Sequence, residues 1–452
     1  MASEQAAKLG QLPITKLLLQ QSVPASIGIL AMSLNILVDT IFVGQWIGSD
    51  AIAAINVVLP VSFFIGALGM AIGIGGGSIL SRALGEGNWQ KAKQTFGNQL
   101  TLTVLLTFSF ACLGLFFSDQ LIPLFGGQGR LFSLAKIYYV IILYGVPVLG
   151  FCMMGNNVVR AEGKPTYAMY AMLLPSVSNI FLDVVFIKGL GWGMTGAAWA
   201  TTLSYGVCGS YLVYFFIRKS ELKISFGDLR LSLPIVIEIG GLGGVTLARQ
   251  AVVSLVVLVV NNLLFEFGGE TQLAIYAIIS RMLMFALFPV LGVTQGFLPI
   301  AGFNYGAQNK ERVLALIRLT LLVVTVMATM VFGLIFFFAG PIAALFTKEA
   351  AVISETPFAM QIVFAATPIL GIQLIGAAYF QAIGKAIPAL LLTLTRQGFF
   401  FLPLVLILPH YYGVLGIWMA FPIGEALATL VTAFFLFREL QNYRVSSEKT
   451  TS

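Results

Sequence analysis

The chain has 452 residues, and only 10% of them are charged, whereas soluble domains carry roughly 25% charged residues. Apolar residues make up 58% and the mean hydropathy is +0.95, so the chain has more hydrophobic surface than a soluble fold could bury. These values exclude an ordinary soluble protein and predict one embedded in a lipid bilayer. The net charge of +7 is interpreted as a topology signal rather than as a surface for nucleic acid.

Apolar stretches of spanning length, roughly 20 residues each, recur twelve times along the chain. Six precede the polar stretch 218–232 and are centred near Leu30, Ala67, Leu106, Leu143, Pro175 and Gly206. Six follow it and are centred near Val256, Phe285, Thr325, Ala366, Leu394 and Phe421. The pattern predicts an all-α integral membrane protein. We expect a bundle at 1–217, a cytoplasmic linker at 218–232 and a second bundle at 233–452 that ends in a short polar tail.

The positive residues are distributed unequally between the two sides of the membrane. With both termini on one side, 18 of the 25 Lys and Arg residues lie on that side. Four lie on the other side, and three fall inside predicted spans. Because cytoplasmic loops carry an excess of Lys and Arg, both termini are expected in the cytoplasm.

The chain contains an internal repeat. Shifting it by 221 residues against itself places Gly85 on Gly306 and Asn88 on Asn309. Further matches are Pro147 with Pro368, Gly150 with Gly371, Lys164 with Lys385 and, at an offset of 220, Gly193 with Gly413. Six helices per half is an even number, so both halves enter the membrane in the same sense. We therefore expect two six-helix bundles related by a pseudo-twofold axis along the membrane normal, with a central site between them.

Several polar residues of the first half have apolar counterparts in the second half. Asp39 is matched by Val260 and Asp183 by Leu404. Three further residues follow the same rule, because their counterparts are Phe400, Ala377 and Phe421: Asn179, Asn156 and Thr201. A repeat supplies its scaffold twice, so polar residues found in only one half are the better functional candidates.

A carboxylate inside a membrane-embedded bundle is costly unless a cation, a proton or hydrogen bonds neutralise it. Asp39 and Asp183, with Asn179 one helical turn before Asp183, offer oxygen ligands for a sodium ion. Alternatively, burial beside a like charge favours protonation of one acid, which allows proton exchange. A third interpretation places either aspartate at a helix end in interfacial water, and it applies more to Asp183, which lies nearer its turn.

Four charged residues lie in or near spans of the second half at positions where the matched residue of the first half is uncharged. They are Arg249, Arg281, Arg396 and Glu425. Two interpretations remain open for this polar network. The residues pair with one another inside the bundle, or they face a substrate. Glu238 lies near the start of the seventh span and is interpreted as interfacial.

Pro24 lies in the first span, 15 residues before Asp39. Proline removes a backbone hydrogen bond from a helix, so Pro24 is a candidate hinge. The glycine-rich run 66–78 superficially resembles a phosphate-binding loop but lacks the following lysine. The spacing of Gly69, Gly73 and Gly77 predicts close helix packing instead.

Six segments together resemble the multidrug and toxic compound extrusion (MATE) family, in its DinF-like prokaryotic branch. They are LVDTIFVGQWIG, NNVVRAEGKP, NIFLDVVFI, GMTGAAWAT, PIAGFNYGAQN and GVLGIWMAFPIGE. The resemblance covers nearly all spans of both halves. It implies a V-shaped pair of six-helix bundles in the plasma (inner) membrane that exports organic, often cationic, compounds in exchange for protons or sodium.

The resemblance also implies particular residues and partners. The cation or proton site of the family corresponds to Asp39, Asn179, Asp183 and Thr201, with Asn156 and Tyr138 as further candidates. No cofactor is implied besides the coupling ion, H⁺ or Na⁺. Drug-like small molecules and membrane lipids are the implied partners of a monomer that binds no nucleic acid. The acid that some members carry deep in the seventh helix has no clear counterpart, which argues against a second ion site.

Other function classes fit the sequence less well. A flippase for lipid-linked precursors, from the same broader superfamily, is the alternative transporter, but it would have a strongly cationic central cavity. A membrane-bound enzyme would need a cluster of reactive groups at the bilayer surface, and the single histidine, His410, offers none. A channel or a passive receptor would not perform uphill transport.

Overall fold

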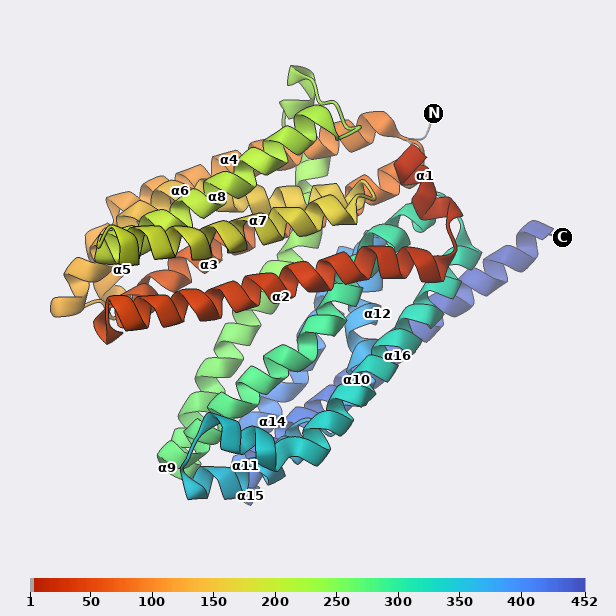
Figure 1. Ribbon diagram of the computed structural model, residues 1–452. Helices are drawn as coiled ribbons and strands as arrows, with labels where there is room; N and C mark the ends of the chain where they lie inside the picture. Colours follow the sequence, from red (N-terminus) through yellow and green to blue (C-terminus); the bar gives the residue numbers. More distant parts are fainter. Residues whose placement is uncertain (1–3, 452) are drawn as a thin grey trace. The chain divides into compact units, whose positions relative to one another are not determined.

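The computed structural model describes residues 4–451, and within them the side chains of residues 8–441 (Figure 1). The outer part of the expected polar tail lies outside the described side chains. The described residues are nearly all helical and contain no strand. Eleven helices are long and apolar enough to cross a membrane. One of them, α9 (Leu233–Gly306), contains two predicted spans, because Gly269 interrupts it with a φ of 67° that favours glycine. The predicted twelve spans are therefore confirmed.

The contacts divide the chain into two units. The first unit comprises residues up to Leu12 and Val23–Leu247, and the second comprises Pro13–Ser22 and the residues from Ala248 onward. The units meet at three boundaries along the chain: one lies between Leu12 and Pro13, just before α2 (Ile14–Trp46), one lies inside α2, and one lies inside α9. Two continuous helices thus contribute residues to both units.

The first unit holds α1 (Glu4–Gln11), most of α2, α3 (Ser49–Gly85), α4 (Trp89–Phe116), α5 (Ser118–Leu124), α6 (Arg130–Ala161), α7 (Pro165–Asp183), the π-helix η1 (Val184–Gly189), α8 (Gly193–Arg218), the short 3₁₀ helix η2 (Phe226–Leu229) and the start of α9. The second unit holds the rest of α9, α10 (Lys310–Phe346), α11 (Ala350–Val363), η3 (Thr367–Ile369), α12 (Leu370–Ala382), α13 (Ala386–Leu394), the π-helix η4 (Thr395–Phe401), α14 (Leu402–Ile407), α15 (Pro409–Tyr412) and α16 (Val414–Thr451).

Glycine allows the helices of the first unit to approach closely. A Cβ atom on Gly69 of α3 would meet the carbonyl oxygen of Gly150 of α6, so the two backbones are in contact there. Helix α6 also packs against α8, and α8 against α7. On α2, Gly28 lies against the side chain of Met172 of α7. This packing brings α2, α6, α7 and α8 around one another.

The repeat is visible in the local structure of each unit. The side chain of Asn88 caps α4 by accepting a hydrogen bond from the Lys91 amide at 2.9 Å. Its match Asn309 caps α10 by accepting from the Arg312 amide at 3.3 Å. Two further matched pairs are glycines with positive φ: Gly163 (77°) with Gly384 (87°) and Gly193 (52°) with Gly413 (58°). The same turns are thus built twice.

The segment between α8 and α9 is bound to the first unit. The side chain of Asn98 on α4 accepts a hydrogen bond from the Ser232 amide at 2.7 Å and donates one to the Arg230 carbonyl at 3.1 Å. Just beyond, Glu238 forms an ion pair with Arg82 of α3 at 2.7 Å. The linker is therefore a docked element, and Glu238 has a protein partner where the sequence analysis assigned it only an interfacial position.

Candidate functional site

Asp183 is the last residue of α7 and is fully buried. The chain continues as the π-helix η1, in which the Leu190 amide donates to the Val185 carbonyl at 2.8 Å. A π turn is wider than an α turn and often marks a functional position. Because Asp183 has no exposed surface, it is not in contact with interfacial water in this structure.

Asp39 lies on α2 and is partly buried. Its carboxyl group and that of Asp183 interact with each other. Both oxygens of Asp183 and Oδ1 of Asp39 are buried, and no amide or hydroxyl in the described part of the chain donates a hydrogen bond to them. Oδ1 of Asn35, one turn before Asp39, is also buried without a donor. The two predicted acids are therefore neighbours with unused ligand oxygens.

Asn179 and Thr201 complete the polar wall beside Asp183. Asn179 is 2% exposed, and its Nδ2 donates to Oγ1 of Thr201 on α8 at 3.4 Å. Thr201 in turn donates to the Ala197 carbonyl at 3.1 Å. Since the amide nitrogen of Asn179 is used as a donor, its carbonyl oxygen is the atom left for a cation.

Two tyrosines line the same place. The buried hydroxyl of Tyr138 on α6 lies near Thr201, Asp39 and Asp183, and its role at this site remains a prediction. Tyr205 of α8, one turn after Thr201, lies near Asp39 and Tyr138. The sequence analysis did not include Tyr205 in the site. The signal was available, because Tyr205 follows Thr201 by four residues and so shares its helix face.

Asn156 takes a different place. Its Nδ2 donates to the Ala168 carbonyl of α7 at 2.6 Å, and its Oδ1 accepts from Nε of Arg160 at 2.9 Å. Both ends of the amide are thus used: the nitrogen joins α6 to α7, and the oxygen binds Arg160 of the same helix. A direct role for Asn156 at the acid pair remains a prediction.

The cluster of Asp39, Asp183, Asn179, Thr201, Tyr138 and Tyr205 is called the acid pair site below. It holds two acidic groups, and no Lys or Arg of the described residues forms an ion pair with either. Two neighbouring ionised carboxylates repel each other strongly in a medium of low dielectric constant. The site can therefore take up a proton, or a monovalent cation bound by carboxylate and amide oxygens.

Pro24 lies inside α2, which is one continuous helix in this structure. The division between the two units passes between Ser22 and Val23, directly before this proline. The candidate hinge is thus placed where α2 passes from one unit to the other.

The charged residues of the second unit fall into two groups. Nε of Arg396 on η4 and Oε2 of Glu425 on α16 lie 2.6 Å apart, and Arg249 on α9 interacts electrostatically with Arg396. Arg281 is exposed, and no described residue forms an ion pair with it. The structure thus brings together three of the four predicted residues.

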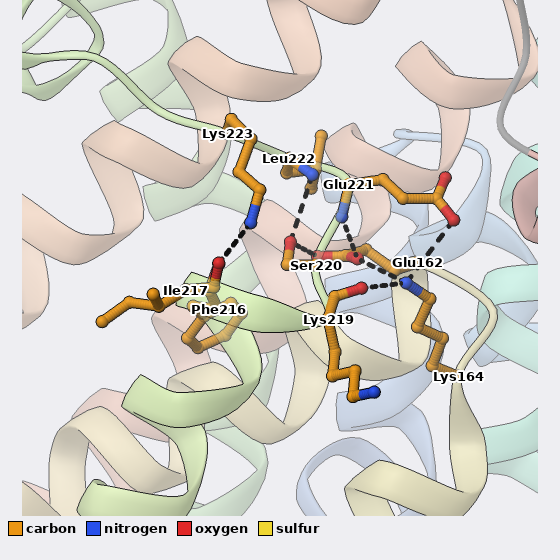
Figure 2. Close-up of polar contacts among 9 residues, drawn as sticks. All are labelled: Glu162, Lys164, Phe216, Ile217, Lys219, Ser220, Glu221, Leu222 and Lys223. Carbon is orange, nitrogen blue, oxygen red and sulfur yellow. Dashed lines mark hydrogen bonds and ion pairs between the residues drawn. The ribbon is translucent and has the colours of Figure 1, made fainter.

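A further polar cluster joins the turn between α6 and α7 to the end of α8 (Figure 2). Glu162 is 4% exposed; it accepts hydrogen bonds from the Ser220 hydroxyl at 2.6 Å and from the Glu221 amide at 3.3 Å. Nζ of Lys164 donates to the Lys219 carbonyl at 2.5 Å and lies 3.8 Å from Glu162 and 3.5 Å from Glu221. Burial raises the pKa of Glu162 to about 7, against the opposing effects of the Ser220 hydrogen bond and the Lys164 charge.

Comparisons with known proteins agree with this architecture. The family model described as MatE matches residues 24–185 and again 246–407, which follows the internal repeat. The multidrug export protein MepA of Staphylococcus saprophyticus is 24% identical over 97% of this chain and 96% of its own. An FAD transporter of Shewanella oneidensis is 27% identical over 97% of this chain and 98% of its own. A crystal structure of MATE in the bent conformation superposes with a TM-score of 0.93 at 26% identity, covering 99% of this chain and all of that one.

Proposed function

The chain belongs to the multidrug and toxic compound extrusion family of membrane transporters, and from this premise we propose that it is a secondary active exporter of drug-like organic compounds. The names of its relatives, a multidrug export protein among them, support this class of substrate. We propose further that export is coupled to protons or sodium ions that enter at the acid pair site.

One observation carries the proposal. Asp183 is buried next to Asp39, and its two oxygens receive no hydrogen bond from the described residues. Leaving both acids ionised and unpaired would cost several kcal/mol (order of magnitude) in a buried site. A proton or a sodium ion removes that cost, so its arrival or departure changes the forces on α2 and α7. A coupling site needs this link between the binding of an ion and the forces on its helices.

The coupled motion we propose is a bend of α2 at Pro24. Proline lacks the backbone N–H that would otherwise hold the helix straight, so bending there is inexpensive. Neutralising Asp39 would release the electrostatic strain on the part of α2 that belongs to the first unit. The form with a straight α2 and the form with a bent α2 would then bind the substrate with different affinities. Paired spin labels on α2 and α7 should report distances that change with pH or with sodium, and unchanged distances would contradict this motion.

We propose that both termini lie in the cytoplasm, which follows from the Lys and Arg distribution. Single cysteines can test this in a cysteine-free background. Ser225 lies before η2 and Ser49 at the start of α3, and both are exposed. They should be labelled from opposite sides of the membrane, and labelling from one side alone would contradict the proposed topology.

The proposed function is tested with the purified chain in proteoliposomes loaded with a fluorescent drug. A pH gradient and a sodium gradient are imposed separately, each with an ionophore that collapses it as the control. Uphill efflux that depends on one of the two gradients is the expected result. Efflux that only follows the drug gradient would indicate a channel or a passive carrier instead.

A further inference from the structure

Three charged residues lie in the middle of membrane-spanning helices of the second unit. Arg249 follows the first residue of α9 by sixteen positions, and Glu425 follows the first residue of α16 by eleven. Arg396 lies ten residues after Ala386 in the span Ala386–Tyr412. Each is thus well inside its span, where an ionised side chain is retained only with a counter-charge or a function.

The cluster holds two positive charges and one negative charge. Nε of Arg396 binds Oε2 of Glu425 at 2.6 Å, and the two side chains are 20% and 10% exposed. Arg249 interacts with Arg396 as a like charge. No acid of the described residues forms an ion pair with Arg249. One guanidinium is therefore uncompensated.

The local backbone positions these groups. Arg396 lies in the π-helix η4, whose turns are wider than those of an α-helix. The Leu392 carbonyl accepts hydrogen bonds from Nε2 of Gln373 at 3.0 Å and from the Thr395 hydroxyl at 2.7 Å, which holds the turn before Arg396. On α9, Val252 lies against η4 at Gly398, so Arg249, three residues earlier, is on the side of α9 that approaches η4.

We propose that Arg249 and Arg396 form a binding site for the anionic group, a carboxylate or a phosphate, of the transported compound. The proposal rests on the export function proposed above and narrows its substrates to compounds that carry a negative group. Guanidinium groups bind these oxyanions through paired N–H donors. Glu425 uses Nε of Arg396, which leaves the terminal nitrogens of Arg396 and the whole of Arg249 for the ligand.

Glu425 acts as a positioning residue in this site. Its bond to Arg396 fixes the direction of that guanidinium, while its other oxygen, Oε1, is buried without a hydrogen-bond donor. A bound anion does not need to displace Glu425, because the cluster retains one positive charge beyond that pair. A bound carboxylate would bring the net charge of the cluster to zero, and a phosphate monoester, with its second negative charge, would make it slightly negative.

Equilibrium binding to the full chain in dodecyl maltoside micelles, which contain no phosphate, tests the site. Two matched pairs of probes differ only in the negative group: riboflavin 5′-phosphate with riboflavin, and norfloxacin with its ethyl ester. We expect the anionic member of at least one pair to bind about tenfold tighter than its partner, the effect of one charged hydrogen-bonded contact. Equal binding within both pairs, or no binding of any probe, would overturn the proposal.

Variants test whether Arg249 and Arg396 cause the tighter binding of the anionic probes. Arg249→Gln should abolish it and also raise the thermal stability, because it removes an unpaired charge, whereas a merely structural arginine would be destabilising to lose. Arg396→Lys keeps the charge beside Glu425 but loses the planar donors, and it should weaken the preference severalfold. Arg281→Gln, an exposed arginine outside the cluster, is the matched control and should leave it intact. A preference that survives both cluster variants would contradict the assignment.

Two further experiments separate this proposal from lipid binding at the same site and from the proposed export function. In nanodiscs of phosphatidylglycerol, a lipid phosphate that occupies the site would compete with the probes and lower their affinity about tenfold, and such competition would overturn the assignment to a transported compound. Asp183→Asn should leave the anion preference unchanged, because the assay uses no gradient. If the unmodified protein showed no gradient-coupled export but kept the anion preference, the result would count against the proposed function alone.

Discussion

The two units treat buried charge in opposite ways. In the first unit, the partly buried Asp39 lies beside the buried Asp183, and no Lys or Arg of the described residues pairs with either. In the second unit, Glu425 is paired with Arg396 at 2.6 Å, and Arg249 adds a further positive charge. The same twofold repeat thus holds an acidic site in one unit and a net basic site in the other.

The difference shows that the two halves of a repeat can keep the same structural elements and still differ in their charged residues. The elements that both units need are kept, as the asparagine caps of α4 and α10 and the positive-φ glycines show. Each unit also has a π-helix in a span next to its charged residue, η1 after Asp183 and η4 around Arg396. We interpret the acidic unit as the one that binds the coupling ion and the basic unit as the one that contributes to substrate binding.

The largest effect is expected at the acid pair. Asp39→Asn and Asp183→Asn should each reduce drug resistance in cells to the level of cells without the transporter, because the amides cannot exchange a proton and bind a cation weakly. Asp50→Asn is the matched control, since Asp50 is exposed in the first turn of α3. Growth in drug, at equal amounts of protein in the membrane, measures the effect. Full resistance in both acid variants would contradict the assignment of ion coupling to the first unit.

The next effect concerns stability, and its sign should differ between the units. Glu425→Gln leaves Arg396 without its partner and should lower the free energy of unfolding by about 3 kcal/mol, since breaking a buried pair strands one charge. Asp183→Asn removes a charge that has no partner and should raise the melting temperature. Thermal unfolding of the purified variants measures both. A shift of the same sign in both would show that the two sites do not differ in the way described.

A pH effect is expected in the polar cluster between α6 and α8. The pKa of Glu162 is about 7, above the ordinary glutamate value of 4.5. The folded state therefore binds this proton more tightly than the unfolded state, and stability is lost as the pH rises from about 4.5 to 7, by up to about 3 kcal/mol. Glu162→Gln, which mimics the protonated acid, should match the wild type near pH 5 and be more stable at pH 8.

The matched lysine of the second unit provides the control for this prediction. Lys385 pairs with Glu439 at 2.6 Å, and its side chain is 43% exposed, in contrast to 7% for Lys164. The Glu439 side chain is 16% exposed, against 4% for Glu162, and an ion pair whose lysine is open to solvent is worth at most about 1 kcal/mol. Glu439→Gln should therefore change stability little between pH 5 and 8. If Glu162→Gln and Glu439→Gln gave the same pH dependence, burial would not be its cause.

The smallest effect is expected at the matched caps. Asn88→Ala and Asn309→Ala should each destabilise by about 1 kcal/mol, because each removes a side-chain acceptor from a helix N-terminus. The cap of Asn88, at 2.9 Å, should be worth more than that of Asn309, at 3.3 Å. Melting temperatures of the two single variants and of the double variant measure this. Strong non-additivity would indicate that the two units unfold as one.

Much of the fold could be predicted from the sequence, because a bilayer demands long apolar helices whose backbone polar groups are satisfied internally. The span count follows from this constraint, and the repeat follows from Gly, Asn and Pro residues that recur at matched turns and helix ends. Asp39 and Asp183 were predicted as site residues because charge inside a span is rare, and the structure places them beside each other. Tyr205 shares a helix face with Thr201, so the sequence allowed it to be included. That this face of α8 lies near Asp39 depends on the rotation of the helix about its axis, which side-chain packing sets.

Other features depend on contacts that no local pattern encodes. Asn156 was grouped with the acids as a polar residue in a span, but its amide hydrogen bonds go to Ala168 and Arg160. Glu238 was interpreted as interfacial, and its ion pair with Arg82, 156 residues away in sequence, was not foreseen. The π-helices were not foreseen, since a π turn depends on tertiary partners such as Gln373 at η4.

The central claim is that Asp39 and Asp183 couple transport to the ion gradient. Proteoliposomes that hold Asp183→Asn separate coupling from translocation when two rates are measured on the same preparation. One rate is exchange of labelled drug against unlabelled drug with no gradient, and the other is efflux driven by an imposed pH or sodium gradient. We predict that drug exchange persists while the response to either gradient is lost. Gradient-driven uphill efflux by this variant and by Asp39→Asn, at the wild-type rate, would contradict the account.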